Sequence, residues 1–251
     1  MARVSQEQMS TGYGIDMAAA AALRLEHAAP GAVIAWAVEE FGRGLTFGTG
    51  FGVEGMALLD MAVKVAPDID VFFLDTEFLF PETYELRLRV EQRYGIEIRA
   101  CHAALAPESQ DELFGPRLWS RDPDLCCRLR KVGPLREALK GRAAWMTAIR
   151  RDQTAIRASA IAVEWDSRWR LVKVNPLASW TRREVWNYIA KNNVPYNPLL
   201  DEGYASIGCT HCTRPVRAGE QERAGRWPGH AKTECGLHGP GELVVLQPAQ
   251  A

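Results

Sequence analysis

The stretch LTFGTGFGVEGMALLDMA, residues 45–62, decides the fold. It opens with a short run of strand character and closes with the apolar spacing of a helix, and a glycine-rich turn, 48–55, lies between them. The turn contains the pattern G-x-G-x-x-G, with Gly52 as its second glycine, and Asp75 stands at the end of the next expected strand. Backbone N–H groups at the start of such a helix can hold a phosphate. The spacing therefore predicts a nucleotide-binding unit, with a plain strand-to-helix turn as the alternative.

Strands and helices alternate on both sides of this unit. Apolar periodicity predicts helices at 17–28, 32–41, 56–66, 81–94, 127–139 and 181–191, and strands at 45–47, 71–74, 96–100, 143–149, 161–165 and 169–174. This alternation predicts an α/β fold, a Rossmann-like parallel sheet with helices on both faces. Polar residues at 75–77 and 150–153 also follow strands. Since parallel strands end at one edge of a sheet, we expect these residues and the glycine turn to share one ligand crevice.

The composition changes after the last predicted helix. From residue 192 onward glycine and proline recur every few residues, which predicts a loop-rich C-terminal segment, 192–251, without a packed core of its own. Residues 1–16 are polar and contain glycine, so we expect a disordered N-terminus there. The α/β domain is accordingly expected to span 17–191.

The composition also excludes several classes of protein. The chain has 251 residues, of which 47% are hydrophobic and 24% charged, as in ordinary globular proteins. It lacks an apolar run of about 18 residues and the pattern of a secretory signal, so we expect a cytoplasmic protein without membrane contact. The net charge of −1 divides into −10 for 1–116, +7 for 117–157 and +2 for 158–251. The basic block suits a phosphate or sulfate ligand or a solvated helix face, whereas the near-neutral whole argues against nucleic acid.

Four of the six cysteines form two groups, Cys126-Cys127 and Cys209-x-x-Cys212. In a reducing compartment, clustered cysteines bind metal more often than they form disulfides. Four thiolates could hold zinc, although an adjacent pair fits its tetrahedral geometry poorly. An iron–sulfur cluster spreads its ligands over several irons and accepts such a pair. Buried free cysteines beside an unrelated C-x-x-C are the third possibility.

The other two cysteines stand alone. Cys235 lies in the glycine-flanked string KTECGLH, where Lys232 and His238 would favour the thiolate. This pattern predicts a nucleophile, with an incidental exposed cysteine as the alternative. Cys101 ends an expected strand and is interpreted as a core residue.

Basic side chains accompany these segments. Arginine binds oxyanions through two parallel hydrogen bonds. The candidates for binding an anionic ligand are Lys131, Arg150, Arg151, Arg157, Arg223 and Arg226.

Several strings together resemble one family, the assimilatory adenylylsulfate (APS) reductases, which are relatives of the phosphoadenylylsulfate (PAPS) reductases. The most specific are C-C-x-x-R-K-x-x-P-L at 126–135, C-x-x-C-T-R-P at 209–215 and E-C-G-L-H at 234–238. The strings L-D-T at 74–76 and R-R-D-Q at 150–153 also match. The glycine turn departs from the usual form of these enzymes, which is richer in serine.

The resemblance implies a fold of the adenine-nucleotide α-hydrolase type and an enzyme that reduces APS to sulfite and AMP. It implies a [4Fe–4S] cluster that acts without net electron transfer, Cys235 as a nucleophile that becomes S-sulfonated, a thioredoxin or glutathione-type reductant and a homo-oligomer. The cluster ligands would be Cys126, Cys127, Cys209 and Cys212. The substrate would contact the six basic residues named above, His238, Gly52 and Asp75.

Three other interpretations remain open at this point. The first is a reductase that prefers PAPS or accepts both substrates. The second is a zinc-stabilised nucleotide-binding module without catalysis. The third is a nicotinamide-dependent oxidoreductase built on the glycine turn.

Overall fold

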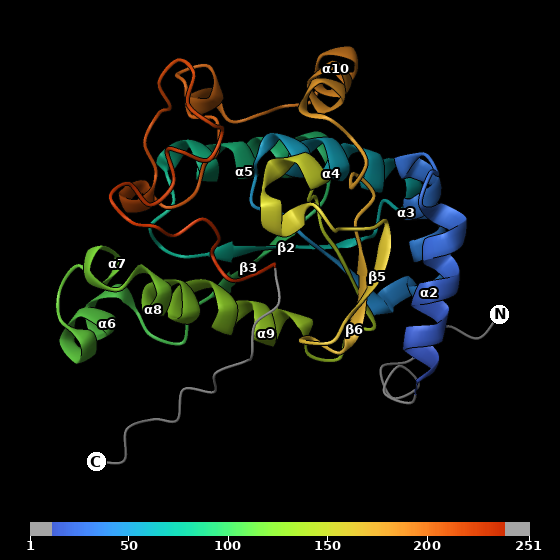
Figure 1. The fold of residues 1–251 in the computed structure, drawn as a ribbon, viewed down its shortest axis with the longest axis horizontal. Helices are drawn as coiled ribbons and strands as arrows, with labels where there is room; N and C mark the ends of the chain where they lie inside the picture. The colour runs from blue at the N-terminus through green and yellow to red at the C-terminus, as the bar shows by residue number, and fades with distance from the viewer. Residues whose placement is uncertain (1–11, 239–251) are drawn as a thin grey trace.

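A computed structural model describes residues 12–238 of the chain. Six strands form one sheet in the order β3-β2-β1-β4-β6-β5 (Figure 1). Their bounds are β1 (Leu45–Gly48), β2 (Asp70–Asp75), β3 (Ile98–His102), β4 (Ala144–Met146), β5 (Val163–Asp166) and β6 (Leu171–Val174). All neighbouring pairs are parallel except β5 and β6, which are antiparallel. The α/β prediction is confirmed, and β5 is reversed because the turn that joins it to β6 is too short for a crossover.

The helices connect the strands and cover the sheet. They are α2 (Tyr13–Leu25), α3 (Pro30–Phe41), α4 (Val53–Val65), α5 (Pro81–Tyr94), α6 (Pro107–Phe114), α7 (Leu118–Arg121), α8 (Pro123–Cys127), α9 (Gly133–Leu139) and α10 (Arg182–Asn192). Among residues 12–238, none of these helices combines the length and the apolar character that crossing a membrane requires.

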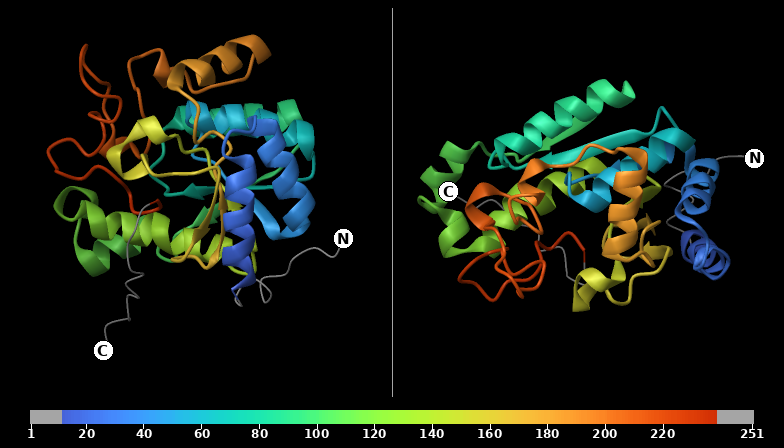
Figure 2. Two further views of the ribbon diagram at one scale, coloured as in Figure 1. Left: turned by 45° about the vertical axis from the view of Figure 1, so that its right-hand side comes forward. Right: turned by 90° about the horizontal axis from the view of Figure 1, so that it is seen from above.

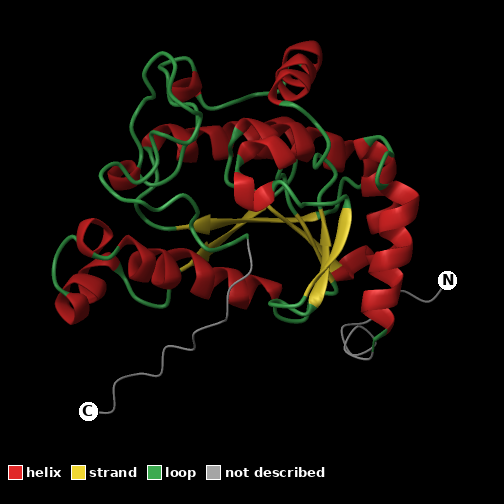
Figure 3. Ribbon diagram, viewed as in Figure 1, coloured by secondary structure: helices red, strands yellow, loops and turns green. Residues whose placement is uncertain are grey.

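Helices lie on both faces of the sheet, as predicted (Figure 3). Successive side chains of a strand point to opposite faces. In β2, Val71 and Phe73 join a large core with apolar residues of α2 to α5 and α10, whereas Phe72 joins a second core that contains Leu135 of α9. The α9 side and the α4 side therefore each have a hydrophobic core against the same strands.

Helices at two places in the chain differ from the sequence-based expectations. Helix α2 begins at Tyr13, inside the segment expected to be disordered, because its small residues Ala18 and Ala21 pack against the core. Residues 1–11 lie outside the described part of the chain. Helices α6, α7 and α8 were not predicted, since they are short and two of them have few buried apolar positions.

The expected helix at 127–139 is divided into three parts. Between α8 and α9 the chain forms a wide π-helical turn, η2 (Arg128–Val132), in which the Gly133 N–H donates to the Arg128 carbonyl. Pro134 has no N–H, and its ring would clash with a carbonyl of the preceding turn in a regular helix. Widening that turn accommodates the proline without ending the helix.

The C-terminal segment lies at one end of the sheet, beside α6, α7 and α8 and opposite α2 (Figure 2). Within 193–238 its regular elements are the short 3-10 turns η5 (Pro198–Leu200) and η6 (Thr210–Cys212). An isolated antiparallel bridge pairs Leu79 with Cys209 and ties the segment to the loop after β2. This contact brings the cysteines of the segment close to the sheet edge.

We expect Gly48→Ala to destabilise the fold. A Cβ at this position, where β1 ends, would lie 2.9 Å from both Phe72 Cζ and Trp145 Nε1, two buried rings. Overpacking of this kind lowers the free energy of unfolding by about 1–3 kcal/mol. Urea denaturation followed by circular dichroism measures the change. Gly31→Ala is the control, because a Cβ there meets open space; equal stability of the two variants would contradict the close packing at Gly48.

Candidate active site

A cavity of about 250 Å³ opens beyond the carboxyl ends of β1, β2 and β4. It is lined by the glycine turn 48–55, by Thr76 after β2, by Gln153 and Arg157 after β4, and by parts of the C-terminal segment. The strand order reverses between β1 and β4, which is where open α/β sheets bind ligands. The structure therefore brings together the three polar segments that were expected to share a crevice.

The glycine turn leads directly into helix α4. Gly52 is the N-cap of α4, and no side chain caps that helix. The turn is closed by Thr49, whose hydroxyl accepts a hydrogen bond from the Phe51 N–H at 3.2 Å. A Cβ on Gly55 would lie 2.8 Å from the same hydroxyl, so glycine allows α4 to start against the turn. The first N–H groups of α4 therefore face a cavity where they can bind a phosphate.

The four paired cysteines line a second, smaller cavity next to the first. Cys126 and Cys127 come from α8, Cys209 directly precedes η6, and Cys212 is the last residue of η6. All four are buried, and the Thr76 hydroxyl lies 3.3 Å from Cys209 Sγ. Burial, together with the neighbouring thiols, raises the pKa of Cys126 to about 12. The same causes raise the pKa of Cys212 to about 11.

Such thiols lose their protons when a positively charged metal centre binds them. Aromatic side chains enclose this cavity: Trp119 and His211 stack with ring centroids 4.5 Å apart. Within residues 12–238, no three His, Cys, Asp or Glu side chains form a group that could hold a single metal ion. The candidate donor atoms are four cysteine sulfurs, which are soft ligands, and they come from two separate segments of the chain.

Cys235 lines the main cavity and packs against the cluster of buried cysteines. Burial raises the pKa of its thiol, but the charge of Lys131 and a backbone hydrogen bond from Leu237 outweigh burial, so the pKa lies below its usual value. Lys131 lines both cavities. Burial lowers the pKa of Lys131, yet the facing thiol groups of Cys209, Cys127 and Cys235 raise it above the usual value. Lys131 lies between the four paired cysteines and Cys235, and its raised pKa favours the charged ammonium form.

The predicted anion-binding residues divide into two groups. Lys131, Arg157, Arg223 and Arg226 line the main cavity, together with Gly52 and His238. Arg150, Arg151 and Asp75 do not line it.

Arg150 is fully buried and forms ion pairs with Glu54, Asp152 and Glu222. Arg151 turns the other way and pairs with Glu26 of α2. The two neighbouring arginines therefore support the structure around the cavity.

Asp75 and His238 have structural partners of their own. The Asp75 carboxylate accepts a hydrogen bond from the Tyr84 hydroxyl at 2.7 Å and holds the end of β2. The His238 ring stacks on Trp145 with centroids 5.2 Å apart. Burial and the surrounding arginines and lysine lower the pKa of His238 well below its usual value, so the imidazole is neutral. Its Nδ1 is buried without a hydrogen-bond partner in the described chain and is available to a ligand in the cavity.

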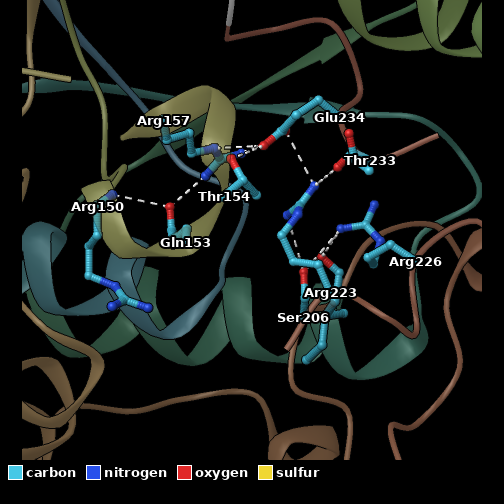
Figure 4. Close-up of polar contacts among 10 residues, drawn as sticks. Arg150, Gln153, Thr154, Arg157, Ser206, Arg223, Arg226, Thr233 and Glu234 are labelled. Atoms are coloured by element: carbon cyan, nitrogen blue, oxygen red, sulfur yellow. Dashed lines mark hydrogen bonds and ion pairs between the residues drawn. The ribbon is translucent and has the colours of Figure 1, made fainter. Parts of the chain in front are cut away.

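Sequence reasoning missed one residue of this region. The Glu234 carboxylate lies between the guanidinium groups of Arg157 and Arg223 (Figure 4). The signal in the sequence was its position as the first residue of the string E-C-G-L-H, directly before Cys235.

Comparisons with known proteins agree with this geometry. The family described as "Phosphoadenosine phosphosulfate reductase domain" matches residues 44–215. An adenosine 5'-phosphosulfate reductase of Halalkalibacterium halodurans is 50% identical over 207 residues, covering 82% of this chain and 90% of the relative. A phosphoadenosine 5'-phosphosulfate reductase of Gloeobacter violaceus is 45% identical over 236 residues, covering 93% and 98%. The crystal structure of a phosphoadenylyl-sulfate reductase from Candida auris, a phosphate complex, is 32% identical with a TM-score of 0.69, covering 86% and 99%.

We expect Arg150→Ala to lower stability strongly, because three carboxylates would lose their buried cation. Breaking a buried ion pair in this way costs about 3–5 kcal/mol. Arg151→Ala is the matched control, since its pair with Glu26 is partly exposed and such pairs contribute about 1 kcal/mol or less. Urea denaturation of both variants measures the difference. An Arg150→Ala protein of unchanged stability that fails only to bind substrate would restore Arg150 to the binding role predicted from sequence.

Proposed function

The chain belongs to the phosphoadenosine phosphosulfate reductase family, and from this premise we propose that it reduces APS to sulfite and AMP with electrons from a thiol. It is an oxidoreductase that acts on sulfur groups. The observation that carries the proposal is the position of Cys235, whose thiol shares the nucleotide-sized cavity with Lys131 and Arg226. In this arrangement the four paired cysteines are buried together, whereas Cys235 lines the cavity proposed to bind the substrate.

The cavity accommodates the two halves of APS at different walls. The glycine turn and the start of α4 suit the nucleotide phosphate, because uncapped N–H groups lie there. Lys131 of η2 and Arg226 of the C-terminal segment suit the sulfate, because both line the cavity together with Cys235. The neutral His238 can exchange a hydrogen bond with the same group through its free Nδ1.

In the first step, the Cys235 thiolate attacks the sulfate sulfur. An S–S bond forms, the bond between that sulfur and the bridging phosphate oxygen breaks, and AMP leaves with the bonding pair. The enzyme then carries an S-sulfonated cysteine. Covalent catalysis of this kind replaces one difficult reduction by two substitutions. The lowered pKa of Cys235 favours the thiolate, which is the nucleophilic form.

In the second step, a thiolate of the reductant attacks Cys235 Sγ. Sulfite leaves, a mixed disulfide forms, and the second thiol of the reductant resolves it, which regenerates the Cys235 thiolate. The reductant supplies two electrons and becomes a disulfide. A thioredoxin or a glutathione-type protein has this chemistry, and the reducing cytoplasm is where it operates. The homo-oligomer implied by the resemblance belongs to the same proposal.

The buried thiols fit a [4Fe–4S] cluster. Cys126, Cys127, Cys209 and Cys212 line one enclosed cavity, and thiolates are the ligands that such a cluster takes. When bound, the cluster supplies a fixed charge distribution beside the substrate and links α8 to the C-terminal segment. The chain itself contributes Lys131, which lines both cavities and orients positive charge toward Cys235.

A reductase that acts on PAPS is the second candidate. The relative from Gloeobacter violaceus, which carries that name, aligns with 93% of this chain. Relative turnover of the holoenzyme on APS and on PAPS distinguishes the two. A value of kcat/KM for PAPS above that for APS would favour the second candidate.

We expect Cys235→Ser to abolish sulfite formation, because a hydroxyl cannot replace the thiolate as the nucleophile and sulfur carrier. The visible absorption of the iron–sulfur holoenzyme should remain, since Cys235 is not among the four proposed ligands. Anaerobic purification, iron and sulfide analysis and a sulfite assay with APS measure both properties. Loss of colour in this variant would make Cys235 a ligand and contradict the assignment.

We expect Cys209→Ser to bleach the holoenzyme and to lower its thermal stability, because metal binding is coupled to folding. Cys101→Ser is the matched control: Cys101 is a half-buried cysteine of β3 outside both cavities, so the variant should keep its colour and its sulfite production. Absorption spectra and thermal denaturation under anaerobic conditions provide the measurements. A stable, coloured Cys209→Ser protein would refute the ligand set.

A further inference from the structure

Glu234 is the residue directly before the proposed nucleophile, and its carboxylate is fully enclosed by hydrogen-bond donors. Arg157 donates from Nε to Oε1 and from Nη2 to Oε2, each at 2.9 Å (Figure 4). Arg223 donates to Oε2 at 3.3 Å, and the Thr154 hydroxyl donates to Oε1 at 3.1 Å. The side chain of Glu234 is 7% exposed. This is a buried, charge-assisted clamp, which is stronger than ordinary surface ion pairs.

The clamp joins parts of the chain that are far apart in sequence. Arg157 belongs to the 3-10 turn η4 (Ala155–Arg157) after β4, whereas Arg223 and Glu234 belong to the C-terminal segment. Other contacts of this stretch are a hydrogen bond of 2.5 Å from Arg168 to the Gly236 carbonyl and the stacking of His238 on Trp145. Neither of them involves an ion pair. Lys232, at the start of this stretch, forms an ion pair with Asp124 of α8. The Glu234 clamp is the ion pair that joins the stretch around Cys235 to the turn after β4, at the sheet edge.

We propose that Glu234 is a positioning residue for the first chemical step. By binding Arg157 and Arg223, it holds Cys235 in the cavity, and it leaves Lys131 and Arg226 to bind the sulfate of the substrate. The inference rests on the proposed function and divides the basic residues of the cavity into two that fasten the chain and two that receive the ligand.

The charges around the cavity support this division. Within residues 12–238, Lys131 and Arg226 form no ion pair with a carboxylate, whereas Arg157 and Arg223 both do. Arg226 donates only to the Ser206 hydroxyl and the Ile207 carbonyl, at 3.3 and 3.4 Å. Two cations without a carboxylate partner among the described residues therefore remain beside Cys235.

Displacement of Glu234 by the substrate is unfavourable for the same reason. A buried carboxylate that loses both guanidinium partners bears a large desolvation cost. If the carboxylate instead moved out to water, Cys235 would move with it, because the two residues are adjacent. Simultaneous binding of Glu234 and the substrate sulfate to different cations avoids both problems.

The first test needs no substrate. In the anaerobic holoenzyme, iodoacetamide should alkylate Cys235 of Glu234→Gln about tenfold or more faster than Cys235 of the wild type, since a neutral amide weakens the charged clamp and exposes the thiol. Mass spectrometry of the C-terminal peptide follows the reaction at this cysteine. Glu220→Gln is the matched control, because Glu220 pairs with Arg214 in the same segment without lining the cavity. Equal alkylation rates in the wild type and Glu234→Gln would overturn the proposal.

The second test separates the two chemical steps. With APS and no reductant, S-sulfonation of Cys235 should be roughly 10- to 100-fold slower in Glu234→Gln, since a misplaced nucleophile loses this much. Release of sulfite from the isolated sulfonated enzyme by thioredoxin should be unchanged or faster, because this step needs an accessible sulfur. A general folding defect would slow both steps, and tighter APS binding by Glu234→Gln would show that the carboxylate competes with substrate. Either result would refute the positioning role.

A double-mutant cycle identifies the partner. Arg157→Gln should reproduce the slow first step, and Glu234→Gln combined with Arg157→Gln should be little slower than either single variant, because both remove one contact. Additive losses would contradict the clamp. If the wild-type holoenzyme neither becomes sulfonated nor releases sulfite, the proposed function fails, whereas the alkylation rates still decide whether Glu234 holds Cys235 in place.

Discussion

The proposed reaction requires the cavity to bring two anions into contact. A thiolate and a sulfate at about 4 Å repel each other by about 1 kcal/mol in water and by several times more at an effective dielectric constant near 20. Buried cations must therefore outweigh this repulsion where the reaction occurs. Lys131 and Arg226 provide that charge, and together with a backbone hydrogen bond from Leu237 they lower the pKa of Cys235 against the opposing effect of burial. Covalent attack on sulfur is possible only where this balance of charge is maintained.

Buried cations in turn need a rigid support, and the sheet provides it. The parallel strands end together, so the loops after β1, β2 and β4 meet at the edge where the strand order reverses. Arg150 lies fully buried beneath this edge and binds one carboxylate from α4 and one from the C-terminal segment. It thereby connects the nucleotide side of the cavity to the segment that carries Cys235. Arg150 therefore supports the site indirectly, because its ion pairs hold the segments that line the cavity in place.

The sequence predicted the strands, the long helices and the crevice because these depend on local periodicity and on the common edge of a parallel sheet. It could not distinguish Arg150 from Arg151, since neighbouring side chains diverge when the chain enters a tight turn: one lies in the interior and the other reaches α2. Helices α6 to α8 carry too little periodic signal to be recognised. The association of Cys209 with α8 depends on packing between distant segments, and the sequence indicated it only through the grouping of the cysteines and the family resemblance. Glu234 begins the string E-C-G-L-H, but its role was not predicted, because a single acidic residue in a loop shows its role only through the partners that fold around it.

The direction of Lys131 shows how a local irregularity determines the chemistry. Pro134 prevents a regular helical turn before it, and the chain forms the wider turn η2 instead. An extra residue in a turn rotates the side chains that precede it relative to those that follow. Within this turn Arg130 is buried and bonds Gln110 and Glu77, whereas Lys131 faces both cavities. A regular helix through 127–139 would place these two charges at different angles. Pro134 therefore helps to set Lys131 between the four buried sulfurs and Cys235.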